Sequence, residues 1–256
     1  MGISVPDMSG VLTSISESIR PVSEMARSVI EGLAPTYERL RRQFQDIART
    51  LDKRLPANWW GVDDPDWDVV ATMAIDEGLP LAWVVPSDDI QRLLAADSGS
   101  HRRRILWQRR APILTACERE LGRLQMAGSE YFAERIREAA AALDSAHPAA
   151  AQALAVNVAD TLGRHYLPRF KHHSSKNGRP STFDPELLAS ALVLGALWAN
   201  YRSYEGGKAP IPRELSRHAT AHDVSKRQYS KINALIAVML ATSLLCWLDR
   251  RAAITR

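Results

Sequence analysis

The segment SRHATAH, residues 216–222, places an arginine and two histidines where they could act together on a phosphate. Histidine titrates near neutral pH, so His222 could accept or donate a proton. The guanidinium of Arg217 matches a phosphate and could stabilise the negative charge that builds on it. One such pair, repeated by a two-fold axis, would suffice to catalyse the attack of a 2′-hydroxyl of RNA on the adjacent phosphate. That reaction needs no metal and no nucleotide, so we expect no cofactor.

The spacing of this pair constrains the site. Side chains five residues apart on a regular helix diverge by about 140°. Either the chain turns after Pro210 and Pro212, or the site is assembled between two protomers. The spacing itself is common, since Arg213 and His218 also match it. The plainer interpretation is a histidine at the start of a helix with a surface arginine beside it.

Basic residues could supply further contacts to RNA. The stretch from Arg164 to Arg179 contains no acid but holds Tyr166 and Phe170, which suits phosphate contacts with bases stacked on rings. A solvated basic loop is the alternative. The predicted RNA-binding residues are Arg164, Arg169, Lys171, Lys176, Arg179, Lys226 and Arg227. A second basic run, Arg102–Arg104 with Arg109 and Arg110, is more typical of a solvated helix face, and a contact to nucleic acid is the weaker alternative.

The sequence lacks the motifs of the common nucleotide-binding, hydrolase and metalloprotease classes. The sequence has no glycine-rich phosphate loop, GxSxG, HExxH or CxxC pattern. The aspartates of DDPDWD, 63–68, lack the spacing of a calcium loop and are expected to cap the next helix. His165, His172 and His173 have no Cys or acidic partner at a zinc spacing, so we expect no metal.

Helical patterning dominates and predicts an all-α fold. A short stretch, LPLAWVVP at 79–86, is predicted to be an edge element or a packed loop. The Ser-Gly-Ser at 98–100 suggests a boundary between an N-terminal helical, partner-recognition region (1–100) and a second helical domain (101–256). The expected helices are 8–31, 36–54, 66–78, 87–96, 101–127, 129–144, 147–167, 183–204 and 225–250. Four tryptophans, expected mainly to fill a core, are Trp59, Trp60, Trp67 and Trp83.

Composition favours a cytoplasmic protein. The chain has 33 Lys+Arg against 29 Asp+Glu and only two cysteines, which predicts buried free thiols in a reducing compartment. The N-terminus shows no secretion signal. The apolar run at 234–248 is shorter than the roughly 20 residues that cross a bilayer. It is therefore expected in a bundle core or a dimer interface, and membrane association through 187–199 and 234–248 is the weaker alternative.

The stretch IPRELSRHATAHDVSKRQYSKINALIAVMLATSLLCWLD, 211–249, resembles the C-terminal part of the HEPN superfamily, and the preceding helix at 183–204 extends the resemblance. The resemblance maps Arg217 to the family's arginine, His218 to the polar residue after it, and His222 to the catalytic histidine. Asp223 stands where glycine often follows, and Val224 where some toxin members carry tyrosine.

The resemblance implies a helical bundle of HEPN type in the C-terminal half, with additional N-terminal helices. It also implies a homodimeric, metal-independent endoribonuclease. The function expected from it is that of a toxin, an abortive-infection protein or an antiviral-defence effector. An antitoxin or regulatory protein would then bind the N-terminal region. The alternative is a catalytically silent HEPN-like module, a phage- or defence-associated factor that binds a protein or nucleic acid.

Overall fold

The computed structural model describes residues 54–180, 183–202, 204 and 210–252, which belong to one unit, Leu51–Arg256. The described residues form helices and loops without a β-strand, which confirms the predicted all-α class. The helices expected at 8–31 and 36–54 lie outside the described residues, apart from Arg54.

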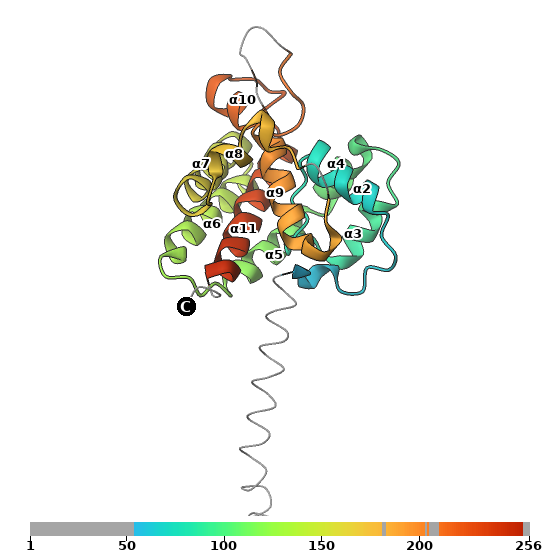
Figure 1. The fold of residues 1–256 in the computed structure, drawn as a ribbon. Helices are drawn as coiled ribbons and strands as arrows, with labels where there is room; N and C mark the ends of the chain where they lie inside the picture. Colours follow the sequence, from blue (N-terminus) through green and yellow to red (C-terminus); the bar gives the residue numbers. More distant parts are fainter. Residues whose placement is uncertain (1–53, 181–182, 203, 205–209, 253–256) are drawn as a thin grey trace, which may run out of the picture. The chain divides into compact units, whose positions relative to one another are not determined.

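The helices carry the numbers used in Figure 1. The first half contains the 3-10 turn η1 (Ala57–Trp59), α2 (Trp67–Ala71), the π-helical turn η2 (Thr72–Asp76), α3 (Ser87–Leu94), α4 (Gly99–Gln108) and α5 (Arg110–Leu121). The second half contains α6 (Ser129–Asp144), α7 (Pro148–Tyr166), α8 (Phe170–His173), the 3-10 turns η3 (Lys176–Gly178) and η4 (Pro185–Leu187), α9 (Leu188–Asn200), α10 (Arg217–His222) and α11 (Lys231–Ala252).

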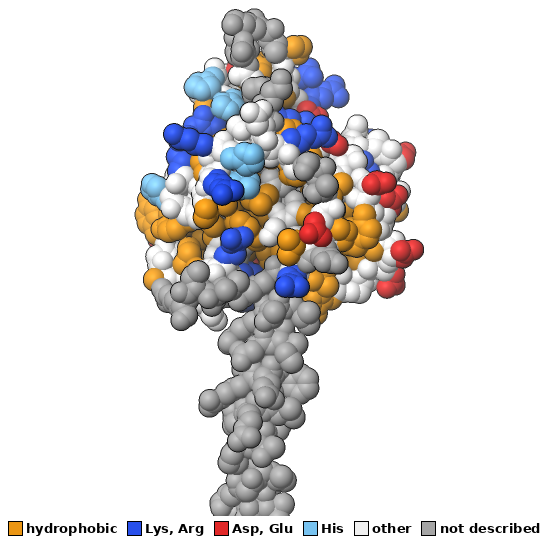
Figure 2. All heavy atoms as spheres, in the orientation of Figure 1, with side chains coloured by type: hydrophobic (Ala, Val, Ile, Leu, Met, Phe, Trp, Pro, Cys, Tyr) orange, Lys and Arg blue, Asp and Glu red, His pale blue; other side chains and the backbone are white. Residues whose placement is uncertain are grey.

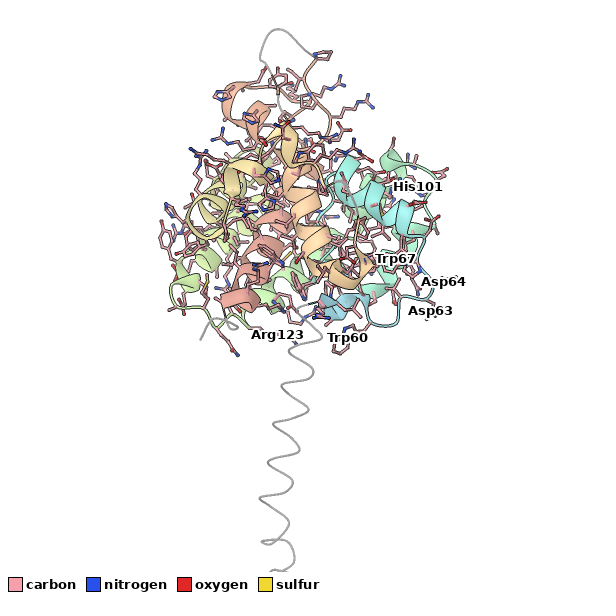
Figure 3. All side chains as sticks on the ribbon, viewed as in Figure 1. Trp60, Asp63, Asp64, Trp67, His101 and Arg123 are labelled. Atoms are coloured by element: carbon pink, nitrogen blue, oxygen red, sulfur yellow. The ribbon has the colours of Figure 1, made fainter. Side chains whose placement is uncertain are left out.

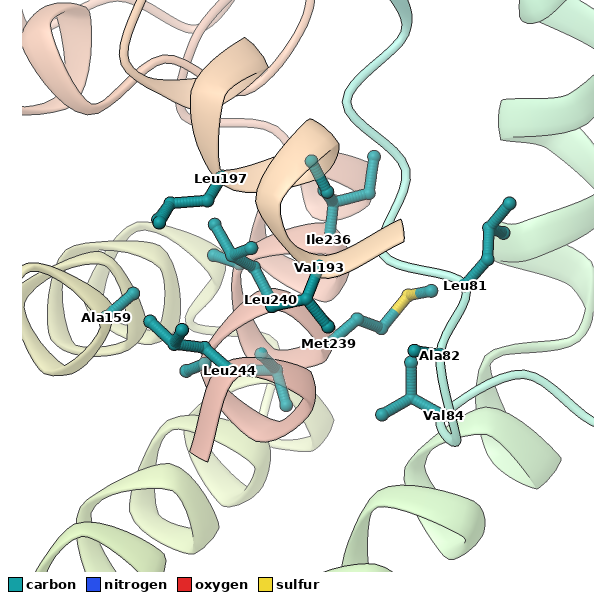
Figure 4. Close-up of a cluster of buried hydrophobic side chains, with 14 of the residues drawn as sticks. Leu81, Ala82, Val84, Ala159, Val193, Leu197, Ile236, Met239, Leu240 and Leu244 are labelled. Carbon is teal, nitrogen blue, oxygen red and sulfur yellow. The ribbon is translucent and has the colours of Figure 1, made fainter. Parts of the chain in front are cut away.

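Helix α11 is the centre of the fold, and α5, α6, α7 and α9 pack around it (Figure 1). Its side chains Met239, Leu240 and Leu244 lie in the hydrophobic core together with Val193 and Leu197 of α9 (Figure 4). The predicted burial of this apolar run is confirmed. By length and composition α11 could cross a membrane, and 94% of its apolar window is buried inside the fold.

The stretch 79–86 is a buried loop and not a strand, and its backbone is satisfied by side chains. Asn58 donates to the carbonyls of Leu81 and Val85, at 2.8 Å each, and accepts from Trp83 N at 2.7 Å. Ser243 of α11 donates to Ala82 O at 3.0 Å. Buried polar backbone needs such partners, which explains how a non-regular segment can enter the core.

The helix predicted at 101–127 is two helices, α4 and α5, which meet at Arg109. Pro112 is the physical reason, because its ring clashes with the carbonyl four residues earlier and it has no N–H to donate. The expectation of a solvated basic face on this helix is correct for Arg104 and Arg110, which are exposed. It is wrong for Arg102, which is buried and paired with Glu77.

The aspartates and tryptophans at 59–68 divide between surface and core. Asp66 caps α2, accepting from Asp68 N and Val69 N, as predicted. Asp63 and Asp64 are exposed on the loop before α2, far from α10 (Figure 3). The expected filling of the core by tryptophan is confirmed for Trp59, which is 3% exposed, and Trp83, which is 2% exposed. The expectation is wrong for Trp60 and Trp67, which are 46% and 37% exposed.

The Ser-Gly-Ser segment begins a helix: Ser98 caps α4 by accepting from His101 N at 3.3 Å. Residues before and after it contribute to the same hydrophobic core, since Leu81 and Leu93 cluster with Leu106 and Ile113. The expected N-terminal region 1–100 is described only from residue 54 onward.

Both cysteines are free and buried, as predicted. Burial raises the pKa of Cys117 and of Cys246 to about 12, so neither is a thiolate at neutral pH.

Candidate functional site

Helix α10, which carries all three predicted catalytic residues, is capped and held by a buried amide. Ser216 Oγ accepts from Ala219 N at 3.2 Å, which satisfies a free N–H of the first turn. Gln228 is fully buried; its Oε1 accepts from Ser216 N at 2.9 Å. Its Nε2 donates to the carbonyls of Pro212 and Glu214, at 3.3 and 3.0 Å. The segment before α10 is therefore tied to the segment after it.

A second amide ties α10 to the bundle. Gln152 of α7 is fully buried and donates to Thr220 Oγ1 at 2.8 Å and to Gln228 Oε1 at 3.3 Å. Tyr229 donates to the carbonyl of Thr220. These hydrogen bonds attach α10 to α7 and to the segment that follows α10, although Gln152 Oε1 is itself buried without a partner among the described residues.

Arg217 faces a carboxylate of α7. Its Nε lies 3.5 Å from Asp160 Oδ1. Asp160 also accepts from Tyr201 Oη at 2.6 Å and from Arg164 Nε at 2.7 Å. Burial of Asp160 opposes its ionisation, but the hydrogen bonds from Arg164 and Tyr201 and the charge of Arg217 lower its pKa. The carboxylate is therefore ionised at neutral pH and holds two guanidinium groups at one place.

His218 lies against the aromatic ring of Tyr201. The two rings meet edge to face with centroids 6.3 Å apart. Partial burial lowers the pKa of His218, and the charges of Arg217 and His222 act in the same direction while Asp160 opposes them. At neutral pH this imidazole is uncharged and suited to accept a proton or a hydrogen bond.

His222 is the last residue of α10 and is exposed. It follows His218 by four residues, so the two histidines share one face of the helix. Arg217 and His222 both lie inside α10, and no turn between them brings them together. Within one protomer they diverge by about 140°.

Asp223, directly after His222, accepts a hydrogen bond from a tyrosine outside α10. Its Oδ2 accepts from Tyr204 Oη at 2.7 Å, and this hydrogen bond raises the pKa of Tyr204. The carboxylate thus joins the end of α10 to residue 204.

The cations predicted to bind RNA lie largely on the surface. Figure 2 shows Lys, Arg and His side chains gathered over α7, α8 and α10, and most of the acidic side chains of this face lie toward its right edge. Arg169 and Lys171 are exposed around α8, and Lys226 and Arg227 between α10 and α11. Nothing is described for the side chain of Lys176.

Two of the predicted RNA contacts already have acidic partners. Arg164 pairs with Asp160 and lies over the ring of Phe170, 5.8 Å from its centroid. Arg179 pairs with Asp76 at 3.0 Å. Both arginine side chains are more than half exposed, so a phosphate can still reach them.

Helix α8 is seated beside α10 through shared aromatic packing. Phe170 is buried and meets Tyr201 edge to face at 5.3 Å, on the ring that also contacts His218. Gly163 of α7 makes room for Phe170, because a Cβ there would collide with the ring. The ring of Tyr201 therefore contacts both the basic α8 segment and α10.

Sequence reasoning missed the residues that organise the site. Asp160 lies four residues before Arg164 on α7, a spacing that indicates an ion pair and could have been noticed. Tyr201, Gln152 and Gln228 give no such signal, because their partners lie far away in the sequence.

The cavity next to Arg217 is small, about 10 Å³, which is room for about one water. A larger ligand would have to bind on the open surface or between two copies of the chain. Among the described residues, no group of three or more His, Cys, Asp or Glu side chains could hold a metal ion.

We compared the chain with known protein families, curated proteins and solved structures. No model of a protein family, no curated protein and no solved structure matches this chain.

Proposed function

We propose that the protein is a metal-independent endoribonuclease of HEPN type that works as a homodimer. The observation that carries the proposal is that Arg217, His218 and His222 all belong to one helix, which buried hydrogen bonds attach to the bundle on the side where basic side chains gather (Figure 2). This set contains a phosphate-binding cation and groups for proton transfer, which is what RNA transesterification requires.

The three residues take different roles in this proposal. Arg217 binds the scissile phosphate and stabilises its developing charge. His222, exposed to solvent, transfers the proton to or from the reacting oxygens. His218, whose pKa is lowered, assists as an uncharged hydrogen-bonding partner. Lys171, Lys226 and the other exposed cations attract the RNA backbone.

A dimer follows from the angle between Arg217 and His222. Since they diverge on one helix, an arginine of one protomer must work with a histidine of the other. In the cell the protein would act in the cytoplasm without a membrane, as a toxin, an abortive-infection protein or an antiviral effector. An antitoxin or regulatory protein would bind the N-terminal region.

The test is cleavage of total cellular RNA by the purified full chain in EDTA. The wild type should cut, and Arg217→Ala and His222→Ala should each lose about 100-fold or more in rate. Arg137→Gln is the matched control, since it removes a cation from α6, where the side chain of Arg137 is 40% exposed and pairs with Glu118. Retained cutting in both site variants would refute the assignment.

A second function is favoured by the ion pair between Arg217 and Asp160. An arginine that already has a carboxylate partner can serve the fold alone, which fits a silent module that binds a protein or nucleic acid. In that case RNA would be bound but not cut, and Arg217→Ala would lower stability without changing any cellular effect. Changing the exposed Trp60 to alanine would abolish that effect and leave the core intact.

A further inference from the structure

A second basic site lies where α4 meets the start of α11. A hollow of about 310 Å³ opens there, lined by Arg103, Arg104, Trp107, Lys231 and Ile232. This volume is at the lower end of the range for small-ligand sites. The described lining residues include three cations and no acid, and none of them belongs to the site on α10.

Arg103 is fixed in the wall of this hollow. One of its terminal nitrogens, Nη2, donates to Asn233 Oδ1 and to the carbonyl of Arg213. The other, Nη1, is buried and has no hydrogen-bond partner among the described residues. Burial lowers the pKa of Arg103, whereas the more distant charges of Glu214 and Glu77 raise it. A guanidinium held mainly by neutral oxygens leaves positive charge uncompensated.

Trp107 provides an aromatic surface between the cations. The indole is half-buried; Lys231 Nζ lies 5.9 Å from its centroid and the guanidinium of Arg110 lies 4.9 Å away. Cation–π attraction restricts these long side chains, so less conformational entropy is lost when they bind an anion.

The position of Lys231 adds a further positive contribution. It is the first residue of α11, a helix of 22 residues, and Ile232 beside it also lines the hollow. The start of a helix carries partial positive charge that favours anions. The hollow therefore combines an aromatic surface, aliphatic stems and concentrated positive charge.

We propose that this hollow binds a nucleoside phosphate, either free or as one unit of an RNA strand, with the base against Trp107 and the phosphate on Arg104 and Lys231. A bare anion would leave the indole unused, and a neutral aromatic compound would leave the cations unused. Both parts of a nucleotide are matched. The proposal does not depend on cleavage by α10.

The experiment is calorimetric titration of the full chain with three probes: uridine monophosphate, inorganic phosphate and a 5′-phosphorylated hexauridylate. The chain carries Arg217→Ala and His222→Ala throughout, so that the strand stays intact. We expect uridine monophosphate or the strand to bind more tightly than inorganic phosphate. Binding of the strand alone would assign the site to a unit of RNA, and binding of both would include the free nucleotide.

Two variants and a control locate the binding. Trp107→Leu should weaken it about five- to hundredfold, the range for removal of one base–aromatic stack. Arg104→Gln with Lys231→Gln should weaken it too, and should reduce the salt dependence of strand binding by about 0.7 for each phosphate that is no longer neutralised. Arg137→Gln should change nothing, and thermal unfolding of each variant checks that it is folded.

Three results would overturn the proposal. The first is binding that neither pocket variant changes. The second is inorganic phosphate bound as tightly as the nucleotide and the strand. The third is no binding of any probe by a folded protein.

Discussion

The hydroxyl of Tyr201 donates a 2.6 Å hydrogen bond to the carboxylate of Asp160, on the oxygen that lies 3.5 Å from Arg217 Nε. The ring of the same tyrosine packs against Phe170 and His218. One residue at the end of α9 thus connects the basic α8 segment, the C-terminal part of α7 and the helix that carries the proposed catalytic groups.

Removing the charge of Asp160 should release Arg217. Asp160→Asn keeps the size of the side chain but weakens its hold on two guanidinium groups, so RNA should bind more tightly. The same change should lower the free energy of unfolding by about 1–3 kcal/mol, the cost typical of removing a charged hydrogen bond. Filter binding and urea unfolding measure the two effects.

Tyr201→Phe is the matched change, since it removes the hydroxyl and keeps the ring against Phe170 and His218. It should cost about 1 kcal/mol of stability with a smaller effect on RNA binding. Weaker RNA binding by Asp160→Asn would show that the carboxylate positions Arg217 for RNA and does not withhold it.

The position of α10 on the bundle should depend on the hydrogen bonds of Gln228. Gln228→Leu leaves Ser216 N and the carbonyls of Pro212 and Glu214 without their partner, which should destabilise the protein by about 2–4 kcal/mol. Amide hydrogen exchange should accelerate in α10 before it does in α11. Gln108→Leu, at an exposed position, should have little effect on either measurement. Equal behaviour of the two variants would show that the buried amide does not hold the helix.

The lowered pKa of His218 should make stability depend on pH in the mildly acidic range. The folded state binds the proton less readily than the unfolded state, whose pKa is near 6.5. The stabilisation is therefore complete above that value and is lost as pH falls through the lowered pKa. Urea unfolding at pH 7.5 and pH 5 should show a larger loss for the wild type than for His218→Gln. An equal or smaller loss in the wild type would contradict the shift.

If the site is shared between protomers, mixing two inactive variants should restore part of the activity. A dimer of one Arg217→Ala chain and one His222→Ala chain keeps one site intact if the arginine and histidine come from different protomers. Refolding the two variants together should then restore about a quarter of the activity, because half of the dimers are mixed and each has one site of two. No recovery would place the pair within one protomer.

The regular helices could be predicted from sequence because apolar periodicity and capping residues are local signals. Helix α6 begins and ends where the pattern predicts, and Asp66 caps α2 as expected. The break at Arg109 follows from Pro112, which is equally local but was outweighed by the continuous basic and apolar pattern around it.

The loop at 79–86 and the surroundings of α10 could not be predicted in this way. The loop enters the core because Asn58 and Ser243 satisfy its backbone, and those partners are distant in sequence. For the candidate site, the types and order of Arg217, His218 and His222 were evident from the sequence. The acid that pairs with Arg217, Asp160, becomes apparent only when α7 and α10 are seen together.

The most direct measurement of the central proposal is the chemistry of the RNA ends after incubation with the wild-type protein in EDTA. Attack by the 2′-hydroxyl predicts 2′,3′-cyclic phosphate and 5′-hydroxyl ends, and their absence after incubation with His222→Ala. RNA that stays intact at excess wild-type protein, or that is cut to 3′-hydroxyl and 5′-phosphate ends, would contradict the proposal.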